Sequence, residues 1–313
     1  MPPGDSLVIS GGKINFRGGG VAKKVKSLLI ESSVVFAATY YAANDGTDLE
    51  LNHQNIELVD ANLVFKSILV KSSRAIITVG QVTLAAENIT LESNAGFDGT
   101  QGGYDREQSF VNYPYQYNTN ANFGGTHGGM GGRVGNQPNL IYGSFDNPVT
   151  KGAGGYRGRH WYYGTERRTG DEGCQPGGAA IKISLTGALT MESNSFIDMS
   201  GSFSIERRGS RPTANSHSVV TGGGGAGGSV WLEVGTLTTE NAKIWARGGK
   251  APNNRYNRRY YNYGYYRDIQ YPDNRDGGGG GGGRIALVCK SSSQNYNDLL
   301  TASVSVAGGG RTA

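Results

Sequence analysis

A unit of roughly two dozen residues occurs three times in this chain, and each copy opens and closes on glycine. The copies extend from Gly177 to Gly201, from Gly227 to Gly249 and from Gly282 to Gly310. Within each copy, apolar and polar residues alternate with the period of a strand that buries one of its faces. Such a unit is too small to bury its apolar face alone, so the repeat predicts coils that stack on one another.

Alignment of the three copies places their apolar residues in shared columns. These columns hold Ile181, Val230 and Ile285; Ile183, Leu232 and Leu287; Leu185, Val234 and Cys289; and, after a short turn, Ile197, Ile244 and Val304. The earlier run from Ala75 to Gly96 matches the same unit, with Val82, Leu84, Ile89 and Leu91 assigned to the columns of its second half. We therefore predict an all-β protein, a parallel β-helix or solenoid.

Short strands joined by short turns are predicted for the first part of the chain. They are Leu7–Ile9, Lys13–Phe16, Ser27–Ile30, Val34–Ala37, Asn55–Val59, Leu63–Phe65, Ile68–Val70, Ile76–Val79, Val82–Leu84 and Ile89–Leu91. We expect residues 1–95 to form compact coils and residues 96–313 to form coils with long insertions rich in glycine, tyrosine and arginine. The two parts are expected to make one continuous solenoid.

Glycine accounts for 52 of the 313 residues, more than twice its average usage, and it clusters between segments with strand patterning. Four long excursions rooted in glycine are predicted, at about Gly96 to Gly132, Gly152 to Gly178, Gly201 to Gly228 and Gly248 to Gly283. We expect them at equivalent corners of successive coils, because insertions in repeat proteins collect on one side. The runs GGGGAGG and GGGGGGG also suit extended, polyproline-II-like segments that pack closely side by side.

Two of these glycine-rich segments carry a resemblance to known proteins. GGGGAGGSVWLEV (Gly222 to Val234) and GGGGGGGRIALVC (Gly277 to Cys289) resemble the glycine-rich repeats of large secreted or cell-surface proteins of ciliates, algae and plants. They are also similar to a glycine-rich region of some receptor tyrosine kinase ectodomains. The resemblance covers Gly177 to Gly310 well and the first part of the chain loosely. It implies an extracellular structural or adhesive role and carries over no catalytic residue.

The formal net charge of +5 is mild for this length, and the basic residues concentrate in predicted loops. This balance favours contact with anionic surfaces or polymers and falls short of a nucleic-acid signature. No segment approaches the ~18 apolar residues of a membrane span. The first residues lack the pattern of a secretory signal, so an extracellular protein with this sequence is expected to be a processed chain or a fragment.

The most distinctive predicted surface segment is Arg255 to Asp276, in which tyrosines and arginines are interleaved. With a second segment at Trp161, it contains the residues that we assign to contacts with another subunit or with a glycan. They are Tyr256, Arg258, Arg259, Tyr260, Tyr261, Tyr263, Tyr265, Tyr266, Arg267, Tyr271, Trp161, Tyr162 and Tyr163. Tyrosine and arginine are enriched in protein interfaces, and the same mixture can stack on sugars or bases. Packing of these loops on one another, over the flank of the solenoid, is the alternative.

Two cysteines do not make a disulfide framework. Cys289 occupies an inward-facing column and is expected to be a buried apolar residue, while a disulfide with Cys174 is possible if the long loop folds back. Asn88 opens the sequon Asn-Ile-Thr and is a candidate for N-glycosylation, because Ile89 and Leu91 would face inward and Asn88 outward.

An enzyme is the class to weigh against a structural protein, because parallel β-helices include polysaccharide lyases and hydrolases with carboxylates on adjacent rungs. The acidic residues here are scattered, and only Glu192 and Glu240 are expected within one or two rungs of each other. The histidines lack metal-ligand spacing, and the glycine runs lack a nucleotide-binding motif. We therefore expect no catalytic residue, no cofactor and no metal.

The sequence thus predicts a non-enzymatic structural protein that forms an extracellular or cell-surface fibre by head-to-tail stacking of its coils. Its partners would be copies of itself, with glycans or anionic polymers as further candidates and no nucleic acid. The alternative is a carbohydrate-binding or carbohydrate-processing β-helix that uses the tyrosine- and arginine-rich loops. A third possibility is an adhesin or receptor ectodomain fragment that does not assemble with itself.

Overall fold

The computed structural model of the protein describes residues 6–9, 13–17, 27–30, 33–37, 41–43, 48–52, 56–59, 61–71, 76–106, 108–110, 124–132, 141–156, 160–162, 165–167, 174–203, 222–251, 257–262, 265–270, 278–290 and 301–310. Over these residues the protein is all-β and contains no helix. The strands form three parallel sheets and two antiparallel hairpins. These findings confirm the predicted fold class at the level of an all-β protein with parallel sheets.

Three parallel sheets, which we name A, B and C, contain all the described strands outside the hairpins. Sheet A consists of β1 (Ser6–Ile9), β3 (Ser27–Ile30), β6 (Asp48–Leu51), β9 (Ser67–Val70), β12 (Asn88–Leu91), β17 (Ala188–Met191) and β20 (Thr236–Thr239). Sheet B consists of β2 (Lys13–Arg17), β4 (Ser33–Ala37), β7 (Ile56–Val59), β10 (Ile76–Val79), β13 (Gly96–Asp98), β18 (Phe196–Asp198), β21 (Lys243–Trp245) and β25 (Ser303–Ser305). Sheet C consists of β5 (Tyr41–Ala43), β8 (Asn62–Val64), β11 (Gln81–Ala86), β16 (Ala180–Leu185), β19 (Ser229–Val234) and β24 (Arg284–Cys289).

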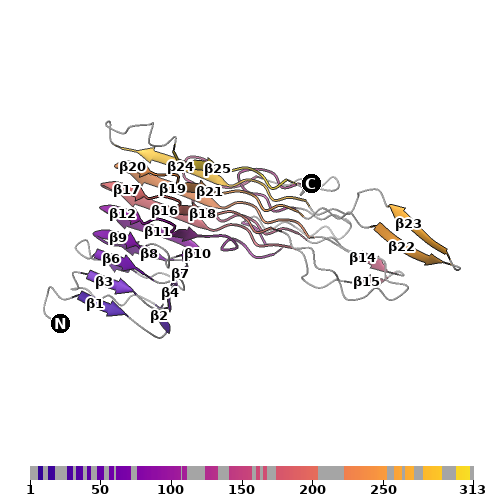
Figure 1. Cartoon of the computed structure of the whole chain (residues 1–313), viewed down its shortest axis with the longest axis horizontal. Coiled ribbons are helices and arrows are strands. Elements are labelled where there is room, and N and C mark those ends of the chain that lie inside the picture. The colour runs from indigo at the N-terminus through magenta and orange to yellow at the C-terminus, as the bar shows by residue number, and fades with distance from the viewer. Residues whose placement is uncertain are drawn as a thin grey trace.

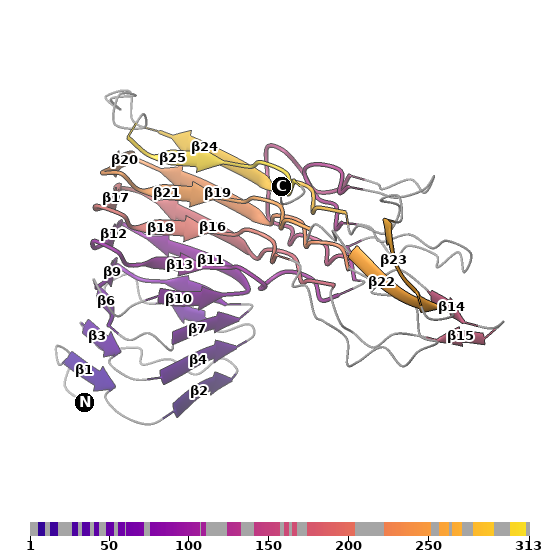
Figure 2. The same cartoon turned by 45° about the vertical axis from the view of Figure 1, so that its right-hand side comes forward.

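The chain passes through the sheets in a repeated order. For example, β16, β17 and β18 follow one another in sequence and belong to sheets C, A and B, and β19, β20 and β21 repeat that order. Each pass therefore places a strand beside the equivalent strand of the pass before it. Figures 1 and 2 show the strands rising in this order from β1 to β24 and β25. We call this part of the molecule the three-sheet stack.

Strand register confirms the columns predicted from the repeat. Ile181 lies opposite Val230, which lies opposite Ile285, and Ile197 is followed by Ile244 and Val304 in the same way. The register follows the alternation of apolar residues, because a slip of one residue would turn every buried side chain outward.

The earlier run from Ala75 to Gly96 was assigned to the wrong columns. Val82 and Leu84 lie opposite Ile181 and Ile183, in the first half of the unit. Ile89 and Leu91 lie opposite Leu189 and Met191 of β17, a third strand that lies between the two sets of columns predicted for the unit. Each full unit therefore contains three strands, and the second-half column is continued by Phe97, opposite Ile197.

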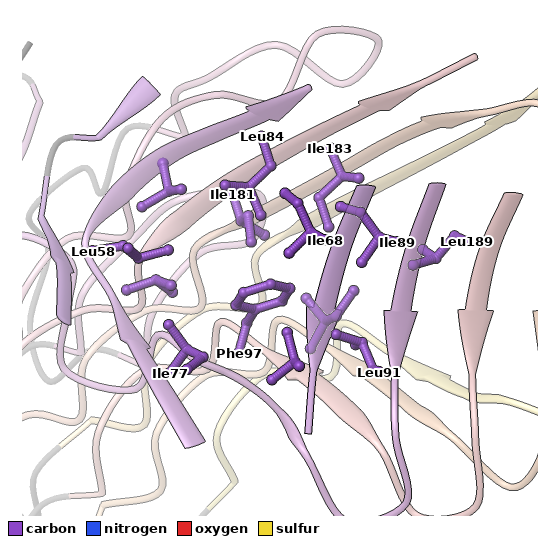
Figure 3. Packing of buried hydrophobic residues seen from close by; sticks show 14 of the residues in the cluster. Leu58, Ile68, Ile77, Leu84, Ile89, Leu91, Phe97, Ile181, Ile183 and Leu189 are labelled. Carbon is purple, nitrogen blue, oxygen red and sulfur yellow. The ribbon is translucent and has the colours of Figure 1, made fainter. Parts of the chain in front are cut away.

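The core of the three-sheet stack is a column of aliphatic side chains around Phe97. Figure 3 shows side chains from all three sheets converging on this ring, among them Ile68 of sheet A, Ile77 of sheet B and Leu84 of sheet C. All four side chains are buried. Burial of each such side chain contributes about 2 kcal/mol, so stacking of coils is the main source of stability in this part of the molecule.

The turn from sheet A to sheet B repeats one backbone conformation. Asn94, Asn194 and Asn241 have positive φ angles of 64°, 59° and 49°, and each lies between a sheet A strand and the next sheet B strand. Asparagine adopts this left-handed conformation more readily than other residues with a side chain, apart from glycine. The recurring asparagine therefore ends one strand and directs the chain into the next.

We expect Asn194→Ala to lower the free energy of unfolding by about 1 kcal/mol, because alanine is strained at positive φ. Asn194→Gly removes the same exposed side chain without that strain and serves as the matched control. Urea unfolding followed by circular dichroism measures both. Equal losses in the two variants would show that the asparagine side chain, and not the backbone conformation, stabilises the turn.

The long insertions all leave sheet B and return to sheet C. They span residues 99–179, 199–228 and 246–283, between β13 and β16, β18 and β19, and β21 and β24. This location agrees with the expectation that the insertions lie at equivalent corners of successive coils. The number of insertions between the described strands, however, is three and not the predicted four. The first two predicted excursions belong to a single connection, because the stretch between Gly132 and Gly152 contains no strand of the three-sheet stack in its described part.

Glycine-rich segments of these insertions run beside one another and form what we call the glycine bundle. Its central segment, residues 222–228, has backbone hydrogen bonds to residues of six surrounding segments. These neighbours are 124–132, 150–156, 174–178, 199–203, 246–251 and 278–283. Segments far apart in sequence are also joined directly: the backbone nitrogen of Gly129 donates to the carbonyl oxygen of Gly282, at 2.9 Å. The bundle is cross-linked by its own backbone in several directions.

Candidate interaction surfaces

Two antiparallel hairpins lie at the end of the glycine bundle that is farthest from the three-sheet stack (Figures 1 and 2). The first pairs β14 (His160–Tyr162) with β15 (Thr165–Arg167), and the second pairs β22 (Asn257–Asn262) with β23 (Tyr265–Gln270). Both belong to insertions that start at sheet B and return to sheet C. The bundle therefore separates these hairpins from the three-sheet stack.

The second hairpin brings together most of the tyrosines and arginines singled out in the sequence. Tyr261 lies opposite Tyr266, and Tyr260 opposite Arg267, while Arg258 and Arg259 precede them on β22 and Tyr265 begins β23. Trp161 and Tyr162 lie on β14 of the first hairpin. The remaining predicted contact residues, Tyr163, Tyr256, Tyr263 and Tyr271, lie outside the described residues. Assignment of this set to contacts with a subunit or a glycan stays a prediction.

A buried histidine of the first insertion, His127, lies among segments of the glycine bundle. His127 is fully buried, with Nδ1 2.8 Å from the carbonyl oxygen of Gly227 and Nε2 2.8 Å from the hydroxyl of Thr150. A carbonyl only accepts hydrogen bonds, so Nδ1 carries the proton and Nε2 accepts from Thr150. His127 thereby joins three segments of the bundle as a neutral imidazole.

The surroundings of His127 favour the neutral form. The pKa of His127 is lowered to about 4, mainly by burial; the positive charge of Arg284 acts in the same direction, and the hydrogen bond to Gly227 opposes both. The guanidinium of Arg284 donates a hydrogen bond to the carbonyl oxygen of Tyr142. The centroid of the Tyr142 ring lies 5.0 Å from that of the His127 imidazole. Sequence reasoning missed this cluster, because its members come from segments more than 140 residues apart.

Of the two acidic residues weighed as a catalytic pair, Glu192 has a structural partner. Glu192 follows β17 and Glu240 follows β20, so the two occupy equivalent turns of adjacent passes, as predicted. The carboxylate of Glu192 accepts hydrogen bonds from the backbone nitrogen and the hydroxyl of Ser93, at 3.1 and 3.2 Å. It therefore connects one turn to the turn below it.

A second pair of carboxylates caps strands of sheet B. Asp98 and Asp198 lie opposite each other on adjacent strands. Asp98 accepts hydrogen bonds from the backbone nitrogen and the hydroxyl of Thr100, and Asp198 accepts from the backbone nitrogen of Ser200. Burial raises the pKa of Asp198, and the charge of Asp98 acts in the same direction. Both side chains stabilise the backbone where it leaves the three-sheet stack for the bundle.

The disulfide that the sequence left possible between Cys174 and Cys289 is not formed, and both residues carry reduced thiols. Ala180 of β16 and Arg284 of β24 occupy equivalent positions in sheet C, two strands apart. Cys174 lies six residues before Ala180, whereas Cys289 lies five residues after Arg284. The two cysteines are thus about eleven residues apart along the strand direction, or roughly 35 Å, against the ~7 Å that a disulfide allows. Cys289 does face the core, but it is only half-buried, and burial raises its thiol pKa.

The sequon asparagine points outward, as its position in the strand predicted. Asn88 is exposed at the start of β12, whereas Ile89 and Leu91 are fully buried. Its side-chain oxygen accepts a hydrogen bond of 2.8 Å from the backbone nitrogen of Ala188, in the next pass of the chain. Glycosylation of Asn88 stays a prediction.

The described part of the chain contains no group of three or more histidine, cysteine, aspartate or glutamate residues placed to hold a metal ion. None of its elements is a helix long and apolar enough to cross a membrane.

The fold and its surfaces define a class of all-β protein in which repeated passes of the chain build parallel sheets and glycine-rich insertions build a backbone-bonded bundle. No protein-family model, no curated protein and no solved structure matches the chain significantly.

Proposed function

We propose that this protein is a non-enzymatic structural and adhesive protein of the extracellular space or the cell surface. In this proposal the three sheets form a parallel β-helix, the insertions form a polyglycine-II-like bundle, and the two hairpins contact a glycan or another anionic partner. The observation that carries the proposal is the location of both hairpins at the far end of the bundle (Figure 1).

The bundle is suited to hold the hairpins at a distance from the three-sheet stack. Its segments are joined by backbone hydrogen bonds in several directions, so bending it would break many of them together. Loops presented by a scaffold of this kind are a common location for binding residues. A low cost of ordering on binding follows, because the two strands of each hairpin are already paired.

Residue types in the hairpins favour a partner with negative charge and planar or ring-shaped groups. Arg258, Arg259 and Arg267 supply positive charge, and Tyr260 and Tyr261 supply ring surface within the same paired strands. Glycans with acidic groups combine both features. Binding is favoured over carbohydrate processing, because Asp98, Asp198 and Glu192 have the structural hydrogen bonds described above.

The test is a glycan array followed by affinity measurements on the best acidic glycan. We expect Arg267→Ala to weaken binding by about tenfold or more, since arginine is a frequent hot-spot residue. Lys66→Ala removes the same charge from an exposed position on the three-sheet stack and is the matched control, expected to bind as the unmodified protein does. Binding should also weaken as salt is raised. Equal effects of the two substitutions, or no glycan bound by the unmodified protein, would contradict the proposal.

A further inference from the structure

The last coil of the three-sheet stack leaves part of the core uncovered. Val304 and Val306 are 46% and 45% exposed, although Ile244 and Ala246, the equivalent residues one pass earlier, are fully buried. Ile285, Leu287 and Cys289 pack against the core and are only half-buried, while their equivalents on β19 are at most 1% exposed. Together these five residues form a surface that we call the terminal face.

The backbone of β24 also has an open edge at this face. The backbone nitrogens of Arg284 and Lys290 donate to carbonyl oxygens at the two ends of β19. The backbone groups of Arg284, of Lys290 and of every second residue between them therefore point toward β19. Because parallel strands alternate the direction of their backbone groups, the N–H and C=O of Ile285, Leu287 and Cys289 face the other way. Among the described strands, none lies beyond β24 in sheet C or beyond β25 in sheet B.

At the opposite end of the three-sheet stack, the first coil offers a matching strand in sheet B. Strands β1 and β2 each have one described neighbour, β3 and β4. Register places Ile14 and Phe16 of β2 in the columns that continue to the buried residues Ile56 and Leu58. Ile14 and Phe16 thus share the register columns of core residues, and β2 runs parallel to the other strands of sheet B, including β25.

We propose that the terminal face binds the first coil of a second copy of this chain, so that sheet B continues from β25 into β2 of the neighbour. The contact repeats the packing of coil on coil that already stabilises each molecule, with the same parallel strands and the same alternation. It joins two different surfaces, so repetition produces a filament. This inference concerns the last coil of the three-sheet stack and not the hairpins, so it holds whether or not the hairpins bind a glycan.

Assembly is tested by mass photometry and negative-stain electron microscopy over a concentration series of the purified chain. We expect dimers and longer linear particles to increase with concentration. Val304→Lys places a charge in the terminal face and should raise the concentration needed for assembly by at least about tenfold. Val288→Lys is the matched control, since Val288 is 44% exposed in the same coil but lies opposite the outward residue Glu233. It should assemble as the unmodified chain does.

A mixing experiment distinguishes this contact from others. Ile14→Lys blocks the first coil, so it should be monomeric alone, as should Val304→Lys. Mixed together, they should form dimers and nothing longer, because the intact terminal face of one meets the intact first coil of the other. Circular dichroism checks that each variant is folded, and Phe16→Lys replaces Ile14→Lys if the latter is not. Monomers of the unmodified chain at all concentrations, a mixture that stays monomeric, or equal losses with Val288→Lys would overturn the proposal.

Discussion

Gly225→Ala should lower the free energy of unfolding by about 3 kcal/mol or more, because the glycine bundle has no room for the added methyl group. A Cβ atom at Gly225 would overlap the carbonyl oxygen of Pro176. That oxygen accepts a hydrogen bond from Ser202, and Gly225 itself donates to Ser202 and accepts from Gly249. Neither side of the contact can move without breaking hydrogen bonds in the bundle.

The matched control is Gly310→Ala, because no atom lies within 4 Å of a Cβ placed there. Neither glycine has a left-handed φ, so the comparison tests space and not backbone conformation. The control should change the free energy of unfolding by less than about 0.5 kcal/mol. Urea unfolding followed by circular dichroism measures both variants. A Gly225→Ala protein that unfolds at the same urea concentration as Gly310→Ala would contradict the close packing of the bundle.

The second large effect is a loss of stability in acid that depends on His127. Its pKa is about 4 in the folded protein and 6.5 in the unfolded chain, so the unfolded state binds the proton first as the pH falls. The stability that His127 supports is complete above pH 6.5 and is lost progressively between about pH 6.5 and 4. A difference of this size corresponds to about 3 kcal/mol.

The measurement is the free energy of unfolding from pH 7.5 to 4, for the unmodified protein and for His127→Asn. Asparagine can still donate to Gly227 but does not titrate, so this variant should be less stable at pH 7.5 and should lack the additional loss below pH 6.5. Other titrating groups, including Asp198, are shared by both proteins and cancel in the difference. Parallel pH profiles would show that His127 does not titrate with unfolding.

Strand positions were largely readable from the sequence, because a strand that packs on one face alternates apolar and polar residues. Ser27–Ile30 and Ile76–Val79 coincide with β3 and β10, and most other predictions differ at the ends only. The strands that were missed are short or polar. β6 has the sequence DLEL and β20 has TLTT, each with only two inward positions. A segment with only two inward residues and otherwise polar neighbours cannot be distinguished from a turn in the sequence. Such a segment becomes a strand only because it stacks on the adjacent coils.

The contacts between the insertions could not be predicted in the same way. Glycine carries no side chain, so a run such as GGGGGGG holds no information on which segments it will lie beside. The disulfide prediction failed for a related reason, since the sequence does not show that Cys174 and Cys289 extend in opposite directions from equivalent strand positions. The environment of His127 likewise depends on Thr150 and Gly227 arriving from other insertions.

By itself, the sequence determined that this protein is built from stacked β-strands, which of their residues face the core, and where glycine interrupts them. Those properties are local, because they follow from the alternation of side chains along each strand. Only the tertiary structure decided that the insertions form one bundle, that the hairpins lie at its far end, and that the last coil exposes Val304 and Val306. These properties depend on which backbone groups meet across long sequence separations, and that is settled by packing of the whole chain.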